Sequence, residues 1–169
     1  MDQILEEAMK EKNILISEMQ SIILSTNSVR NIPNSSYAPS IQSFDGNFYI
    51  YVSELSKHTS NIIVNPKISI MIIEDESKSD NLFARKRLTI ECDSYKLDRN
   101  SDEWKIIIEE MQLKLGDTIK FLKDMKDFHL FKLIPESGLL VYGFGKAFRL
   151  KGKNLDEFDH LNDKGHKKN

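Results

Sequence analysis

Several stretches of the chain alternate apolar and polar residues with the period of two that is typical of β-strands. Tyr37–Ser43 and Asn47–Ser53 flank Asp45-Gly46, and Asp-Gly between two such stretches predicts a hairpin. The apolar run Ile68–Ile73 predicts a central strand that is buried on both faces. Ala84–Leu97 predicts a longer strand, and the change of phase in its second half predicts a bulge of the kind that lets a sheet close into a barrel.

Other stretches have the spacing and composition of helices. Gln3–Gln20 is rich in Leu, Ile, Met, Glu and Lys and contains no Gly or Pro, so it predicts an N-terminal helix. Lys57–Val64 predicts a short helix. An apolar stripe along Trp104–Leu115 predicts a third helix, which Gly116 ends. Further strands are predicted at Ser21–Ser28, Phe128–Leu133 and Leu139–Phe148.

The order of these elements predicts the fold class. Several early strands, a helical insertion and two late strands favour an α+β fold built on a barrel rather than repeated βαβ units. Residues 1–150 are expected to form this domain, and residues 151–169 a C-terminal tail. In the tail, Asn154 and Glu157 have capping-box spacing, which predicts a short helix that docks on another surface; the alternative is a frayed C-terminus. The apolar side of the helix would consist of Leu155, Phe158 and Leu161.

Composition narrows the class of protein. With 169 residues, 40% of them apolar, the chain has the size of one domain with its own core. The longest apolar run is too short to cross a bilayer, and the N-terminus lacks the pattern of a signal peptide. A net charge of −2 gives no basic surface for nucleic acid. The single cysteine, Cys92, fits a reducing compartment and an inert core position, so we expect a cytoplasmic protein that binds neither nucleic acid nor membranes.

Three successive cations stand inside the stretch predicted as a long strand: Arg85, Lys86 and Arg87. In an extended strand Arg85 and Arg87 share one face, and Lys86 takes the other. Two guanidinium groups at this spacing suit the carboxylates or phosphates of a ligand. The alternative is a salt-bridged strand in which the cations pair with the preceding carboxylates, Glu74, Asp75 and Glu76. The pattern alone leaves both interpretations open.

A series of short motifs follows in order along the chain: Ser35-Ser36-Tyr37-Ala38-Pro39, Lys57–Glu76, Leu82–Thr89, Asp127–Phe131, Gly143–Phe148, His160-Leu161 and Gly165-His166-Lys167. In this order they resemble the HutZ/HugZ family of bacterial haem-utilisation proteins, within the FMN-binding split-barrel superfamily of pyridoxamine-phosphate oxidase. The resemblance is closer to the short HutZ-type members than to HugZ-type proteins with a longer N-terminal extension. It implies a homodimeric, antiparallel split β-barrel of about six strands, with Greek-key-like connections and flanking helices.

The resemblance also implies a function. The protein would bind haem and degrade it oxidatively, releasing the iron, with electrons from an unidentified donor. His166 would be the axial ligand of the haem iron. Asp127, from across the dimer interface, would hydrogen-bond that histidine and make it a stronger donor to iron. His160 and Asp124 are the alternatives for these two roles. The residues that would pair with the haem propionates are Arg85, Lys86 and Arg87.

A second set of residues lies where flavin-binding members of the superfamily hold the FMN phosphate. It consists of Lys57, His58 and Thr59, beside the hydroxyl group of Ser56. We interpret this set as an inherited scaffold, because the haem role of the HutZ/HugZ family does not depend on a bound flavin. Two alternatives to haem degradation stay open: a non-catalytic haem carrier or storage protein, and an FMN-dependent oxidoreductase of the same fold.

Overall fold

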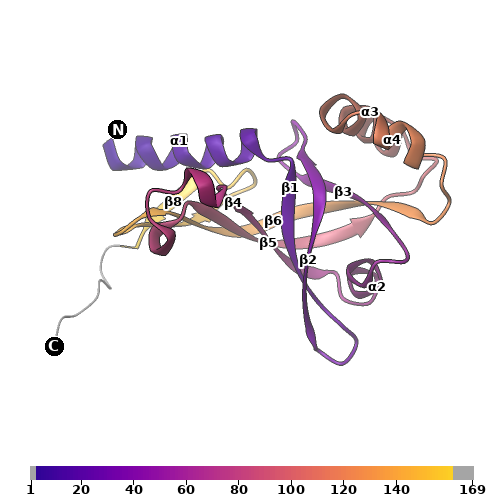
Figure 1. Ribbon diagram of the computed structural model, residues 1–169, viewed down its shortest axis with the longest axis horizontal. Coiled ribbons are helices and arrows are strands. Elements are labelled where there is room, and N and C mark those ends of the chain that lie inside the picture. The colour runs from indigo at the N-terminus through magenta and orange to yellow at the C-terminus, as the bar shows by residue number, and fades with distance from the viewer. Residues whose placement is uncertain (1–2, 162–169) are drawn as a thin grey trace.

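In this computed structural model, which describes residues 3–161, the chain forms one eight-stranded sheet with helices around it (Figure 1). The helices are α1 (Gln3–Glu18), α2 (Lys57–Val64), α3 (Asp102–Leu115) and α4 (Asp117–Leu122), with short 3₁₀ turns η1 (Glu76–Lys78) and η2 (Leu82–Ala84). The strands are β1 (Ser21–Asn27), β2 (Pro33–Gln42), β3 (Phe48–Ser53), β4 (Lys67–Ile73), β5 (Arg87–Lys96), β6 (Phe128–Gly143), β7 (Lys146–Lys151) and β8 (Glu157–His160). None of the described helices has both the length and the apolar character needed to cross a bilayer.

Pairing between β3 and β6 closes the first six strands into a barrel. The sheet order is β3-β2-β1-β4-β5-β6-β7-β8, and the additional β3–β6 pairing joins the two ends of its first six members. Every described pairing is antiparallel. β7 and β8 continue the sheet outside the closed part. The predicted α+β split-barrel fold with flanking helices is therefore confirmed.

β6 is long enough to take part in both the barrel and its extension. Phe128–Leu133 pair with β3 and Gly138–Gly143 lie along β7, while β5 pairs with both parts. The register with β5 shifts between Glu91 and Cys92, which leaves Glu136 as the extra residue. This confirms the predicted irregularity, although the extra residue belongs to β6 rather than β5. A bulge bends its strand, and here it accompanies the change of β6 from one partner to the other.

Two apolar clusters hold the fold together. The first fills the barrel and includes inward residues of β3, β4 and β5 together with one side of α1: Phe48, Ile50, Ile70, Ile72, Leu88, Ile90, Ala8 and Leu15. The second lies outside the barrel, between β3 and the helices α3 and α4: Tyr49, Tyr51, Leu130, Ile107, Ile108, Met111 and Ile119. Since alternate residues of β3 enter different clusters, this strand is buried on both faces.

β4 is fully buried on only one face in the single protomer. Its inward residues Ile68, Ile70 and Ile72 are buried, but the residues between them are only half-buried on the outer face: Ser69, Met71 and Ile73. The single protomer therefore buries one face of the run Ile68–Ile73, and burial of the other face by a second copy stays a prediction. An apolar outer face on a central strand indicates a surface that a further molecule could cover.

Two local expectations are wrong. β5 begins at Arg87 instead of Ala84, because the Asn81 side chain accepts a hydrogen bond from the Phe83 amide (2.9 Å) and caps η2 just before it. The helix expected after Asn154 is replaced by β8, which pairs with β7. An open strand edge beside this segment offers backbone hydrogen bonds that outweigh its local capping pattern. The expected docking occurs, since Leu155 is buried and Phe158 packs against the core.

A polar cluster joins α3 to the barrel. The Tyr49 hydroxyl lies 2.9 Å from Asp45 Oδ2 and 3.0 Å from Glu103 Oε1, and its single proton serves one of them at a time. Lys132 Nζ lies 2.8 Å from Glu103 and 3.6 Å from Asp45, so it compensates both charges. Burial acts to raise the pKa of Asp45, but hydrogen bonds from Asn47 and Tyr49 outweigh it and hold the pKa below its ordinary value.

Replacing Tyr49 with Phe should lower the free energy of unfolding by about 1–2 kcal/mol near neutral pH, because two half-buried carboxylates lose their shared donor. Asp45, whose pKa is lowered in the folded state, contributes stability above about pH 4 that is lost as the pH falls through its folded pKa. The difference between wild type and Tyr49→Phe in urea titrations should therefore shrink in acid. Tyr95→Phe is the control, since Tyr95 is exposed; equal losses in the two variants would contradict the prediction.

Candidate functional site

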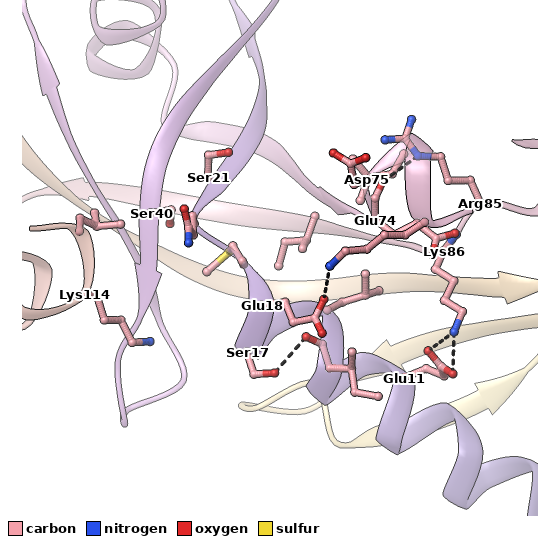
Figure 2. Close-up of a pocket in the computed structure, with 18 residues that line it drawn as sticks. Glu11, Ser17, Glu18, Ser21, Ser40, Glu74, Asp75, Arg85, Lys86 and Lys114 are labelled. Carbon is pink, nitrogen blue, oxygen red and sulfur yellow. Dashed lines mark hydrogen bonds and ion pairs between the residues drawn. The ribbon is translucent and has the colours of Figure 1, made fainter. Parts of the chain in front are cut away.

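A groove of about 840 Å³ opens between α1, the end of β4 and the segment that leads into β5 (Figure 2). This volume is within the range of small-molecule binding sites. Apolar side chains line part of it: Ile14, Leu15, Met19, Ile72, Ile73 and Leu115. Acidic and basic side chains are present in equal number: Glu11, Glu18, Glu74, Asp75, Lys78, Arg85, Lys86 and Lys114.

Two of the three predicted cations line this groove, and both are already paired. Arg85 Nη1 donates to Glu76 Oε1 at 3.0 Å. Lys86 Nζ lies 2.8 Å from both carboxylate oxygens of Glu11, and this hydrogen bond raises the pKa of Lys86 (Figure 2). The alternative of a salt-bridged segment is thus what the protomer shows for Arg85 and Lys86. An anionic ligand would have to compete with these carboxylates.

Arg87 differs from its two neighbours. It is the first residue of β5, and its Nη1 donates to the Arg85 carbonyl oxygen at 2.9 Å. Within residues 3–161 it has no carboxylate partner, so its charge is the most available of the three. The expectation that Arg85 and Arg87 share a strand face is wrong, because Arg85 precedes the strand, with Nε bonded to the Glu74 carbonyl oxygen (2.7 Å).

The second predicted set, at the start of α2, is mostly part of the protein interior. Thr59 is fully buried and donates its hydroxyl proton to the Ser53 carbonyl oxygen at 2.6 Å. His58 is buried with Nδ1 3.0 Å from Ser36 Oγ, and burial lowers its pKa. Only Lys57 is exposed. Two of the three residues therefore fasten α2 to the barrel, and a phosphate-binding role for the set stays a prediction.

Asp127 lies in the turn between α4 and β6, beside the end of β3. Its Oδ2 accepts a hydrogen bond from Ser53 Oγ (3.0 Å), and its carbonyl oxygen accepts one from the Glu54 amide (2.8 Å). The alternative residue, Asp124, is exposed and has no hydrogen bond or ion pair from its side chain within the described chain. Ser53, which sequence reasoning missed, thus contacts both the α2 region, through Thr59, and Asp127. Nothing in its local pattern marks it, because the contact with Asp127 joins segments distant in sequence.

The histidines differ in how far they are engaged. His129 Nε2 contacts the Glu54 carboxylate, and His160 Nε2 lies 3.0 Å from the Gly145 carbonyl oxygen while its ring stacks on a phenylalanine of β7. Each histidine of residues 3–161 therefore has a hydrogen-bonding partner within the protomer. His166, the predicted axial ligand, lies outside the described residues. No role is assigned to it by the geometry of the protomer.

The structure does not bring the predicted residues together in one protomer. Arg85, Lys86 and Arg87 lie beside the segment between β4 and β5, whereas Lys57, His58, Thr59 and Asp127 gather where α2 meets the β3–β6 pair. Figure 1 shows these two places at opposite ends of the barrel. A single site that used both sets would need residues from two copies of the chain.

A row of side chains crosses the outer face of the barrel between these two ends. Cross-strand pairing aligns one outward residue from each of β2, β1, β4, β5 and β6: Tyr37, Ile23, Met71, Thr89 and Leu139. Tyr37 is 69% exposed and Leu139 is 39% exposed. The adjacent row on this face contains Ile73, Arg87 and Val141. Alternation marks each residue as outward, but it does not say which strands are neighbours, so the sequence did not show the row.

The described residues contain neither a metal site nor a reactive thiol. Among residues 3–161 no group of three or more His, Cys, Asp or Glu side chains is arranged to hold a metal ion. Cys92 is buried in the barrel, and burial raises the pKa of its thiol to about 12. A thiol with this pKa is not a nucleophile at neutral pH, so the expectation of an inert core cysteine is confirmed.

Comparison with known proteins adds to this geometry. The pyridoxamine 5'-phosphate oxidase family model matches residues 5–142. The haem oxygenase HutZ of Vibrio cholerae serotype O1 is 41% identical over 151 residues, which span 89% of this chain and 85% of HutZ. The region matched by the family model contains β1–β5, most of β6, both sets of predicted residues and Asp127.

Solved structures give the same picture. The crystal structure of HutZ from Vibrio cholerae, described as a haem storage protein, has a TM-score of 0.72 and 38% identity, covering 75% of this chain and 89% of that chain. The crystal structure of Campylobacter jejuni ChuZ has a TM-score of 0.85 and 34% identity, covering 97% of this chain and 66% of that chain. The ChuZ structure thus matches nearly all of this chain, and the HutZ structure three quarters of it.

Proposed function

The chain belongs to the pyridoxamine 5'-phosphate oxidase family and is similar to HutZ, and on this premise we propose that it binds haem and degrades it oxidatively, releasing the iron. The observation that carries the proposal is the 41% identity to the HutZ haem oxygenase over most of both chains. Bound haem would supply the site at which dioxygen is activated, and an electron donor the reducing equivalents. The protein's own residues would bind, orient and tune the haem.

The proposed site lies between two copies of the chain. The cations beside β5 and the Asp127 region are at opposite ends of one protomer (Figure 1). The outer row that includes Ile23, Met71 and Leu139 lies on the outer face of the barrel. A two-fold related copy that packs on this row would bury it and place the Asp127 end of one protomer near the cations of the other. Arg87, beside the row and free of carboxylate partners, is the proposed propionate contact.

The C-terminal tail supplies the proposed iron ligand. The Leu161 amide donates to the Ala147 carbonyl oxygen (2.9 Å), so the tail leaves the barrel next to the strand edge of β7. His166 follows five residues later, a distance of at most about 17 Å along an extended chain. His166 is the proposed ligand because the resemblance of Gly165-His166-Lys167 to the HutZ/HugZ family implies this role. Asp127, with one carboxylate oxygen unused in the described contacts, is the proposed partner of its imidazole.

A second function is haem storage or transfer without degradation. It is favoured by the description of one similar crystal structure as a haem storage protein. The two functions differ in a direct observation: a degrading enzyme given haemin, a reductant and air loses its Soret absorption, whereas a storage protein keeps it. FMN-dependent chemistry, which the family name also suggests, would instead give a yellow protein as purified.

Met71→Glu should separate the two copies, because it places a charge in the middle of the proposed interface row. We expect a homodimer for the wild type and a folded monomer for the variant in sedimentation equilibrium at micromolar concentration, with weakened haemin binding. Leu113→Glu is the control, since Leu113 is 87% exposed on α3 and lies away from the row. A wild-type monomer would contradict the interface and the shared site together.

Arg87→Met should weaken haemin binding about tenfold or more, which corresponds to the loss of one charge-assisted contact. Arg85→Met should have a smaller effect on haemin, because Arg85 is already paired with Glu76 in the protomer. Absorbance titration with haemin measures both, with circular dichroism as the check on folding. If both variants bind haemin as the wild type does, the cations are structural.

His166→Ala should shift the Soret band of the haemin complex and abolish reductant-driven loss of that band. Asp127→Asn should keep most of the binding but slow haem loss by about 10–100-fold, because an amide is a weaker acceptor for the imidazole N–H. His160→Ala is the control and should leave the Soret band in place, since His160 is held by Gly145. A normal spectrum for His166→Ala, with a shift for His160→Ala, would exchange their roles.

A further inference from the structure

The backbone around Asp127 is fixed by Arg99, a residue that reaches it from the loop between β5 and α3. Its guanidinium group donates to three carbonyl oxygens of the turn before and at the start of β6: Lys123, Met125 (2.7 Å) and Phe128 (2.8 Å). These carbonyls lie on both sides of Asp127. One of the guanidinium nitrogens also donates to the Tyr51 hydroxyl at 3.1 Å. The turn that carries Asp127 is therefore tied to the barrel and to a second loop by a single side chain.

Arg99 is suited to this task by its shape and charge. The planar guanidinium presents several donors at fixed angles, which a lysine cannot reproduce. Its carbonyl partners include that of Lys123, the C-cap of α4, and unpaired carbonyl groups at a helix end carry a partial negative charge. The guanidinium carbon also lies 5.1 Å from the centre of the Trp104 ring, so α3 covers it. Arg99 thus occupies one defined position rather than a range of solvated ones.

The carboxylate of Asp127 is fixed separately, by Ser53. The Ser53 hydroxyl oxygen accepts a hydrogen bond from the Leu55 amide (3.1 Å) and lies 3.0 Å from Asp127 Oδ2. Because the amide occupies the acceptor side and a carboxylate can only accept, the hydroxyl proton points at Asp127. One carboxylate oxygen is therefore held, and the other has no hydrogen-bonding partner within residues 3–161.

We infer that Ser53 and Arg99 are positioning residues for Asp127, which prepare its carboxylate to accept the imidazole N–H of the haem ligand. The inference rests on the proposed function and deepens it. Arg99 sets the place of the Asp127 backbone, and Ser53 selects the orientation of the carboxylate so that one oxygen stays open. A carboxylate held before the ligand arrives loses no rotational freedom when it binds, which strengthens its hydrogen bond to the imidazole.

The test is the iron–histidine stretching frequency of the ferrous haem complex, measured by resonance Raman, because it rises with the strength of the hydrogen bond to the ligand imidazole. Ser53→Ala should lower this frequency in the direction of Asp127→Asn and slow haem loss by about tenfold. Ser53→Thr, which keeps the hydroxyl group, should restore the wild-type frequency. An unchanged or raised frequency in Ser53→Ala would overturn the role of Ser53.

Arg99→Lys tests the backbone contribution without removing the charge. Hydrogen exchange of the haem-free protein should show faster exchange confined to the turn before β6, and the haem complex should show a lowered iron–histidine frequency. Wild-type exchange in this turn would overturn the role of Arg99. Failure of the proposed function gives a different result: the wild type would then form no haemin complex, or would keep its Soret band with reductant and air, whatever the frequency in Ser53→Ala.

Discussion

The hydrogen bonding between β3 and β6 is the constraint on which the rest of the structure depends. It closes six strands into a barrel and so creates an interior for the first apolar cluster. It also fixes where β3 ends, since Ser53 pairs with Phe128 at the edge of this ladder. The Asp127 turn, the start of α2 and the loop that carries Arg99 all meet at this strand end. A fold that left β3 and β6 apart would lose the core and the candidate site at once.

Much of the fold could be predicted from the sequence because its signals are local. The Asp45-Gly46 hairpin, with Gly46 at a φ of 83°, the helix at Lys57–Val64 and the stop at Gly116 each depend on neighbouring residues. One expectation failed because a distant segment decides: β8 replaced a predicted tail helix because β7 offers a free edge. Another failed through a local cap: Arg85 left the predicted strand face because Asn81 caps η2 just before it. The roles expected for His166 and Asp127 rest only on the resemblance, and Ser53 and Arg99 emerge only from contacts across the fold.

The same geometry explains why one protomer does not assemble the predicted site. The barrel separates the cations near β5 from the Asp127 region, and the outer row between them is half-exposed in the single chain. A two-fold related copy would place its Asp127 region near the cations of the first copy, and the pair of chains would have two equivalent sites. Interface formation and ligand binding would then be thermodynamically linked, since a ligand that contacts both copies stabilises their association.

The paired charges of the groove beside α1 have a consequence for the rate at which ligands arrive. Glu11 binds Lys86, Glu76 binds Arg85, and Lys78 lies 3.5 Å from Glu18, so the charges there largely cancel. A surface with cancelled charges projects little field beyond a Debye length of about 8 Å at physiological ionic strength. An anionic ligand would therefore reach this end of the barrel by unguided diffusion, and its association rate would depend only weakly on salt.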